Sequence, residues 1–90
     1  MEYEYIPRGV CTRKIIADIA QDGTVEGISF IGGCPGNTIG IGRLVKGMKI
    51  DQVIETLEGV KCGGRNTSCP DQLALMLNEI KAGNGHNRKE

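Results

Sequence analysis

The hydrophobic pattern of this chain changes its period at Gly32-Gly33, and that change constrains the fold more than any other feature. Before it, residues 2–6 alternate charged and aromatic side chains, whereas residues 12–20 and 25–31 are rich in Ile and Val. Asp22-Gly23 lies between the latter two segments and favours a tight hairpin turn, because glycine readily adopts the positive φ that such turns need. The side chains expected to share the buried face are Ile15, Ala17, Ile19, Ile28 and Phe30. These residues predict a three-stranded antiparallel meander with one packed face.

The pattern after this point is helical. Residues 37–46 have apolar side chains on one side, and residues 50–57 have them at i, i+3, i+4 and i+7. The clearest helix start follows Ser68, which can form a capping box with Asp71, so the last helix is expected over about residues 69–82. The predicted fold is therefore α+β, with two to three helices packed on one face of the three-stranded sheet.

Two glycines interrupt the first of these helices. Gly40 and Gly42 each cost a helix about 1 kcal/mol relative to alanine. We expect the reason to be a close approach of this helix to the sheet or to another helix.

The length of 90 residues allows one domain, expected over residues 1–83 and followed by a flexible tail over residues 84–90. A chain this short buries little surface, and it has only 2 Tyr, 1 Phe and no Trp to fill a core. A cross-link or a bound metal would therefore be useful to its stability.

The charges of the chain balance, with 11 basic and 11 acidic residues. No charge excess attracts the chain to nucleic acid or to an anionic membrane, and no apolar run approaches the length of a membrane span. The acidic residues at positions 2 and 4 are unlike a signal peptide. We therefore expect a cytoplasmic protein with reduced thiols, in which cysteines serve metal binding or catalysis.

The cysteines are the strongest functional candidates. Cys11, Cys34, Cys62 and Cys69 all fall in loops or at the ends of predicted elements, and glycines flank three of them. Two of them, Cys34 and Cys69, precede or begin a helix, where unpaired N–H groups favour a thiolate. This placement favours one metal site formed by all four residues; separate structural thiols and a redox or disulfide pair are the alternatives. The only histidine, His86, is interpreted as a surface residue of the tail.

The segment Thr67-Ser68-Cys69-Pro70-Asp71 is the signature of the TSCPD domain family, and residues 3–82 resemble that family. Such domains occur as small free-standing proteins and at the C-terminal end of adenosylcobalamin-dependent ribonucleotide reductases. The resemblance implies that Cys11, Cys34, Cys62 and Cys69 are metal ligands. It also implies a link to ribonucleotide reduction and hence to DNA synthesis.

The order of elements is also similar to that of the U-type iron–sulfur scaffold proteins. Those proteins have cysteines before a hairpin, in a glycine-rich turn before a helix, and at the start of the last helix, which match Cys11, Cys34 and Cys69. One position departs, because Arg13 stands where that family has an aspartate two residues after its first cysteine.

These features lead to one main interpretation and three alternatives. The main interpretation is a small metal-binding module for zinc or an iron–sulfur cluster, acting as an accessory or regulatory partner of ribonucleotide reductase or of an iron–sulfur pathway protein. Catalysis by this chain on its own is not expected, since 90 residues cannot hold a reductase barrel. The alternatives are an iron–sulfur scaffold or carrier, a thiol-redox protein that uses Cys62 and Cys69, and an interaction domain with inert cysteines.

Overall fold

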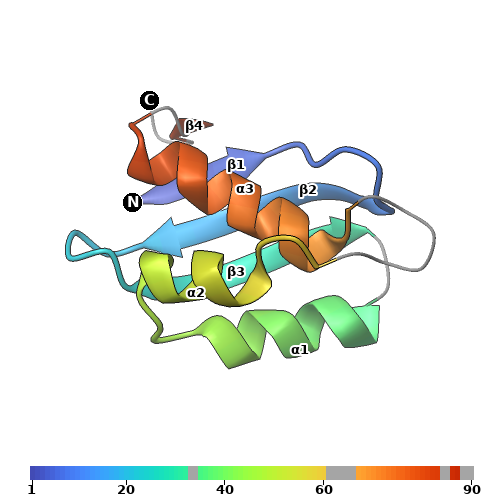
Figure 1. The fold of residues 1–90 in the computed structure, drawn as a ribbon, viewed down its shortest axis with the longest axis horizontal. Coiled ribbons are helices and arrows are strands. Elements are labelled where there is room, and N and C mark those ends of the chain that lie inside the picture. The colour runs from blue at the N-terminus through green and yellow to red at the C-terminus, as the bar shows by residue number, and fades with distance from the viewer. Residues whose placement is uncertain (33–34, 61–66, 84–85, 88–90) are drawn as a thin grey trace.

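The computed structural model describes residues 1–32, 35–60, 67–83 and 86–87 of the chain. Within these ranges a strand-rich first part is followed by helices and a short last strand (Figure 1). In order, the elements are β1 (Glu2–Tyr5), β2 (Thr12–Ile19), β3 (Val25–Gly32), α1 (Pro35–Val45), α2 (Ile50–Leu57), α3 (Cys69–Lys81) and β4 (His86–Asn87). The α+β class, with an antiparallel meander and helices on one face, is confirmed.

The described strands form one antiparallel sheet in the order β3-β2-β1-β4. In the β2–β3 register Ile15 opposes Phe30 and Ala17 opposes Ile28, so the face predicted to be buried is the face that packs. The short strand β4 adds to the outer edge of β1. It lies within the segment for which the sequence suggested a tail.

The connection between β2 and β3 is the expected turn. The amide of Gly23 donates to the Ala20 carbonyl at 3.0 Å, and the amide of Ala20 donates to the Thr24 carbonyl at 2.9 Å. Gly23 has φ of 87°, a value that glycine adopts without strain. The Asp-Gly sequence therefore acts as predicted.

The core lies between the sheet and the helices (Figure 1). Fully buried side chains include Ile15 of β2, Val53 of α2 and Leu77 of α3. On the other face of the sheet, Lys14 of β2 forms an ion pair with Glu4 of β1 at 3.4 Å. Among the described residues, no helix has the length and apolar character needed to cross a membrane.

Of Gly40 and Gly42, the two glycines of α1 for which a close approach was expected, only Gly42 makes one. A Cβ on Gly42 would lie 2.9 Å from the Ile28 carbonyl oxygen, so α1 packs its backbone directly against β3 at this position. A Cβ on Gly40 would meet nothing within 4 Å, so close approach does not explain that residue.

Candidate functional site

Cys69 is the first residue of α3, and the residues around it fix where the helix begins. Ser68 precedes it in an extended conformation, with φ of −150° and ψ of 170°, and its hydroxyl accepts a hydrogen bond from the Asp71 amide at 3.1 Å. Pro70 fits the first turn because that turn needs no amide donor. The sequence therefore holds Cys69 at the N-terminus of a helix, as predicted.

The sulfur of Cys69 has a polar neighbour from the sheet. The Thr12 hydroxyl oxygen lies 3.0 Å from Cys69 Sγ, and either atom can donate the hydrogen bond. A shift of register between Thr12 and Lys14 allows Thr12 and Ile15, three positions apart, both to point toward the helices. Thr12 is only 2% exposed, so its hydroxyl is held against this sulfur.

Cys11 lies at the same end of the sheet as Cys69. It directly precedes Thr12, the residue that contacts the Cys69 sulfur, and its own side chain is exposed. Both thiols are free. The structure thus brings two of the four predicted ligands to one end of the molecule, the end where β2 and α3 begin (Figure 1).

Cys34 and Cys62 lie outside the described residues. Two described residues that border the segments holding Cys34 and Cys62 contact residues of the site. Gly32, which ends β3 before Cys34, pairs with Thr12. Val60, which precedes the segment that holds Cys62, accepts a hydrogen bond through its carbonyl from the Ser68 hydroxyl at 2.6 Å. Both segments therefore have anchors next to Thr12 or Cys69.

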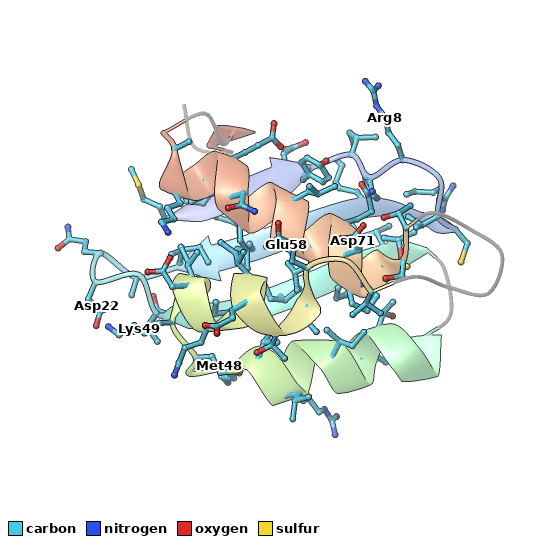
Figure 2. All side chains as sticks on the ribbon, in the orientation of Figure 1. Arg8, Asp22, Met48, Lys49, Glu58 and Asp71 are labelled. Carbon is cyan, nitrogen blue, oxygen red and sulfur yellow. The ribbon has the colours of Figure 1, made fainter. Side chains whose placement is uncertain are left out.

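The other polar residues of the signature serve this anchoring. The Asp71 carboxylate accepts hydrogen bonds from the Gly59 amide at 2.8 Å and from the Thr67 hydroxyl at 2.5 Å. Together with the bond from Ser68 to Val60, these contacts fasten the chain after α2 to the start of α3. Figure 2 shows Asp71 at this end of α3, with Glu58 at the end of α2.

Gln72 connects the start of α3 to the segment between β1 and β2. Its side-chain oxygen accepts a hydrogen bond from the Arg8 amide at 3.0 Å, and its side-chain nitrogen donates to the Thr67 hydroxyl at 3.0 Å. Gln72 is 5% exposed, so these bonds satisfy a buried amide. We call Thr67, Ser68, Asp71 and Gln72 the cap network.

Tyr5 lies near the cap network and stays neutral. Burial raises the pKa of its hydroxyl, and the negative charge of Glu79 and then that of Asp71 act in the same direction. The positive charge of Arg8 opposes them. Tyr5 is therefore suited to packing and to donating a hydrogen bond rather than to acting as a base.

Sequence reasoning did not identify Thr12 or Gln72 as part of the site. No pattern in a single sequence distinguishes Thr12, because its position depends on the irregular register of β2. Gln72 did carry a signal, since it is a polar residue on the apolar face that also includes Leu73 and Met76. A buried polar side chain on such a face needs partners, and here the partners are site residues.

The described residues contain no group of three or more His, Cys, Asp or Glu side chains arranged to hold a metal ion. Cys11 and Cys69 are among these described residues, whereas Cys34 and Cys62 are not. What the described part provides is two free thiols, a hydroxyl in contact with one of them, and an anchored helix start.

Comparison with known proteins agrees with the signature. The family model of the TSCPD domain matches residues 1–81, which is nearly the whole chain. Searches of curated proteins and of solved structures give no significant match. The match covers every described helix and strand apart from β4, including the segment that holds the cap network and Cys69. The chain therefore belongs to the TSCPD domain family.

Proposed function

We propose that this chain is a cysteine-based metal-binding module in which Cys11, Cys34, Cys62 and Cys69 bind one zinc ion or one iron–sulfur cluster. The observation that carries the proposal is the contact between Thr12 and Cys69 at the end of the sheet where Cys11 also lies. The anchors at Gly32 and Val60 support it, because each borders a segment that contains one of the other two cysteines.

The chemistry of the described residues fits a thiolate site. Metal binding requires a deprotonated sulfur, which can only accept a hydrogen bond. Thr12 would then be the donor in its contact with Cys69 Sγ. Hydrogen bonds to ligand sulfurs orient them and tune the bound metal, so Thr12 would act as a positioning residue.

The nature of the metal determines the role. Four thiolates around zinc leave no open position and would make the site structural. An iron–sulfur cluster would instead give a carrier, a scaffold or an electron-transfer module. In either case we infer an accessory or regulatory function with a protein partner, by analogy with the TSCPD domains at the C-terminal end of adenosylcobalamin-dependent ribonucleotide reductases.

The test is to purify the protein without oxygen, measure its metals and sulfide, and record its absorption spectrum. We expect either zinc with no visible absorption or iron and sulfide with a visible band. Changing any of the four cysteines to serine is expected to lower the metal content. Leu75→Ser is the matched control, because Leu75 lies on α3 with an exposed side chain.

Two outcomes would contradict the proposal. One is a protein that binds neither zinc nor iron and sulfide, even after reconstitution under reducing conditions. The other is a mild oxidation that joins Cys62 to Cys69 reversibly in a protein that never binds metal, which would favour the thiol-redox function.

A further inference from the structure

The outward face of α1 carries large apolar side chains that face solvent. Ile39 is 55% exposed and Leu44 is 73% exposed, a higher value than for any other large apolar side chain that the structure describes. The inward side of the helix is already used, because Thr38 and Val45 are buried and Gly42 lies against β3. Figure 1 shows α1 at the outer edge of the helix layer. A helix that is apolar on both sides is typical of an element with partners on both sides.

The charged side chains that usually cover a surface helix are almost missing from α1. Its only charged residue is Arg43, whereas the shorter helix α2 carries Asp51 and Glu55. Lys46 follows directly after α1, and neither it nor Arg43 forms an ion pair with a described residue. Glu26 of β3 lines the same groove as these two residues without pairing with either. The outward side of α1 therefore combines apolar surface with two positive charges that have no ion-pair partner among the described residues.

Gly40 lies in the middle of this surface and leaves a notch in it. Residues one and four positions apart are neighbours on a helix, so the side chains of Ile39, Arg43 and Leu44 surround the position of Gly40. A Cβ on Gly40 would meet nothing within 4 Å, so the notch is open. Glycine destabilises a helix relative to alanine, and no contact within the described residues accounts for it here. We call Ile39, Gly40, Arg43 and Leu44 the α1 face.

The shape of the α1 face fits a second helix. Helices pack by placing side chains of one between the side chains of the other, and a glycine lets a large side chain approach the backbone closely. A side chain placed over Gly40 would lie between Ile39 and Leu44. An extended segment would gain less, because the backbone groups of α1 are already bonded within the helix and cannot pair with an added strand.

The charges distinguish a different protein from a second copy of this chain. Two copies of α1 packed against each other would bring Arg43 and Lys46 of both together, and α1 has no carboxylate to pair with them. A helix with Asp or Glu beside its apolar residues supplies the missing negative charges. Charge complementarity thus favours an acidic partner.

We propose that the α1 face binds an acidic amphipathic helix of a partner protein. An apolar side chain of the partner lies over Gly40 between Ile39 and Leu44, and its carboxylates pair with Arg43 and Lys46. The proposal makes no use of the cysteines and does not depend on the proposed metal site.

The first experiment selects binders from a library of alanine-based helices of about 14 residues, or four turns. One face of each helix varies among Leu, Ala, Ser, Glu and Lys. We expect enrichment of Leu and Glu and depletion of Lys, and the variant R43E/K46E should reverse the preference to Lys. The control R8E changes a charge far from α1 and should leave the selection unchanged (Figure 2). No preference for Glu over Lys, or the same preference in R43E/K46E, would overturn the proposal.

The second experiment measures the affinity of a selected helix for variants of the α1 face. Leu44→Ser should weaken binding by at least about tenfold, whereas Leu75→Ser, at an exposed position of α3, should not change it. Gly40→Leu fills the notch and should weaken binding as much. Leucine favours a helix more than glycine does, so this variant should not lower Tm, and its loss of binding is not a loss of folding. Unchanged affinity in Leu44→Ser or Gly40→Leu would overturn the proposal.

The third experiment tests the kind of occupant. Proline at the centre of a selected helix breaks it and should abolish binding, with the amide shifts of the unbroken helix centred on residues 38–46. Binding that tolerates the proline would show that the occupant is not a helix. Concentration-dependent dimerisation that Leu44→Ser abolishes, in a protein that binds no selected helix, would show that the occupant is a second copy. Either result would overturn the proposal.

Discussion

The residues of the TSCPD signature divide into one that carries sulfur and several that position it. Ser68 and Asp71 form hydrogen bonds to the backbone of the chain that follows α2. The Thr67 hydroxyl donates a hydrogen bond to Asp71 and accepts one from Gln72. A motif of this kind therefore fixes a loop and a helix start together. Within the signature, Cys69 obtains its position from neighbours whose hydrogen bonds go to the chain after α2 and to one another.

Removal of the Ser68 hydroxyl tests this division. Ser68→Ala should lower the free energy of unfolding by about 1–2 kcal/mol, since it deletes the helix cap and the bond to Val60. The control is Thr56→Ala, whose exposed hydroxyl donates to the Gln52 carbonyl within α2; its loss should change stability by less than about 0.5 kcal/mol. Equal losses in urea denaturation would contradict a positioning role for Ser68.

Thr12 provides a second residue-level prediction. Thr12→Val keeps the side-chain volume but removes the donor to Cys69, and should weaken metal binding by roughly tenfold to a hundredfold. Thr12→Ser retains the hydroxyl and should restore most of the affinity. The measurement is competition with a chelator. If Val and Ser variants bind equally well, the contact with the sulfur has no role in the site.

Asp22 lies at the opposite end of the sheet and predicts a pH effect. Hydrogen bonds from the Thr24 side chain, from Lys49 and from the Thr24 amide lower the pKa of its carboxyl from 3.8 to about 2 (Figure 2). Because the folded-state pKa is depressed, the stabilisation is full above about pH 4 and is lost as the pH falls toward 2.

Asp22→Asn should therefore lower Tm at neutral pH, and the difference from the parent protein should shrink below pH 4. The Asp22 carboxyl should titrate near pH 2 by NMR. A midpoint near the ordinary value of 3.8, or a Tm difference that persists at low pH, would show that these contacts do not stabilise the carboxylate.

At the scale of elements, α1 contains a matched pair of glycines with opposite expected effects. Gly42→Ala places a Cβ 2.9 Å from the Ile28 carbonyl oxygen, so it should destabilise the protein by about 1–3 kcal/mol. Gly40→Ala meets open space and should stabilise it by roughly 0.5–1 kcal/mol through helix propensity. Thermal unfolding of both variants decides; a shift of the same sign in both would contradict the packing of α1 on β3.

The elements were largely predictable because their signals are local. The bounds of α2 and α3 follow from the apolar stripe after Ile50 and from the cap at Ser68, and the hairpin follows from Asp22-Gly23. The pairing of β4 with β1 was not predicted, because two residues in a polar tail have no recognisable pattern. We expected a close approach to explain Gly40, but a Cβ at this position would meet open space. A glycine in a helical sequence does not by itself indicate close packing.

At the scale of the whole molecule, the residue types of the site could be predicted from the sequence, but their arrangement in space could not. The sequence identified the four cysteines and the helix start at Cys69, because residue type and capping are local. It could not identify Thr12 as the neighbour of that sulfur, since the contact joins residues 57 positions apart through an irregular strand register. The predicted convergence of Cys34 and Cys62 on the same point stays a prediction, because both lie outside the described residues.

The central claim, that four thiolates hold one metal centre, is tested most directly by X-ray absorption at the edge of the bound metal. The protein is purified without oxygen, or reconstituted, and its metal is identified first by elemental analysis. We predict a first coordination shell of sulfur only, with four scatterers at about 2.3 Å if the metal is zinc. A shell of nitrogen or oxygen, or a sulfur shell unaffected by Cys69→Ser, would contradict the account.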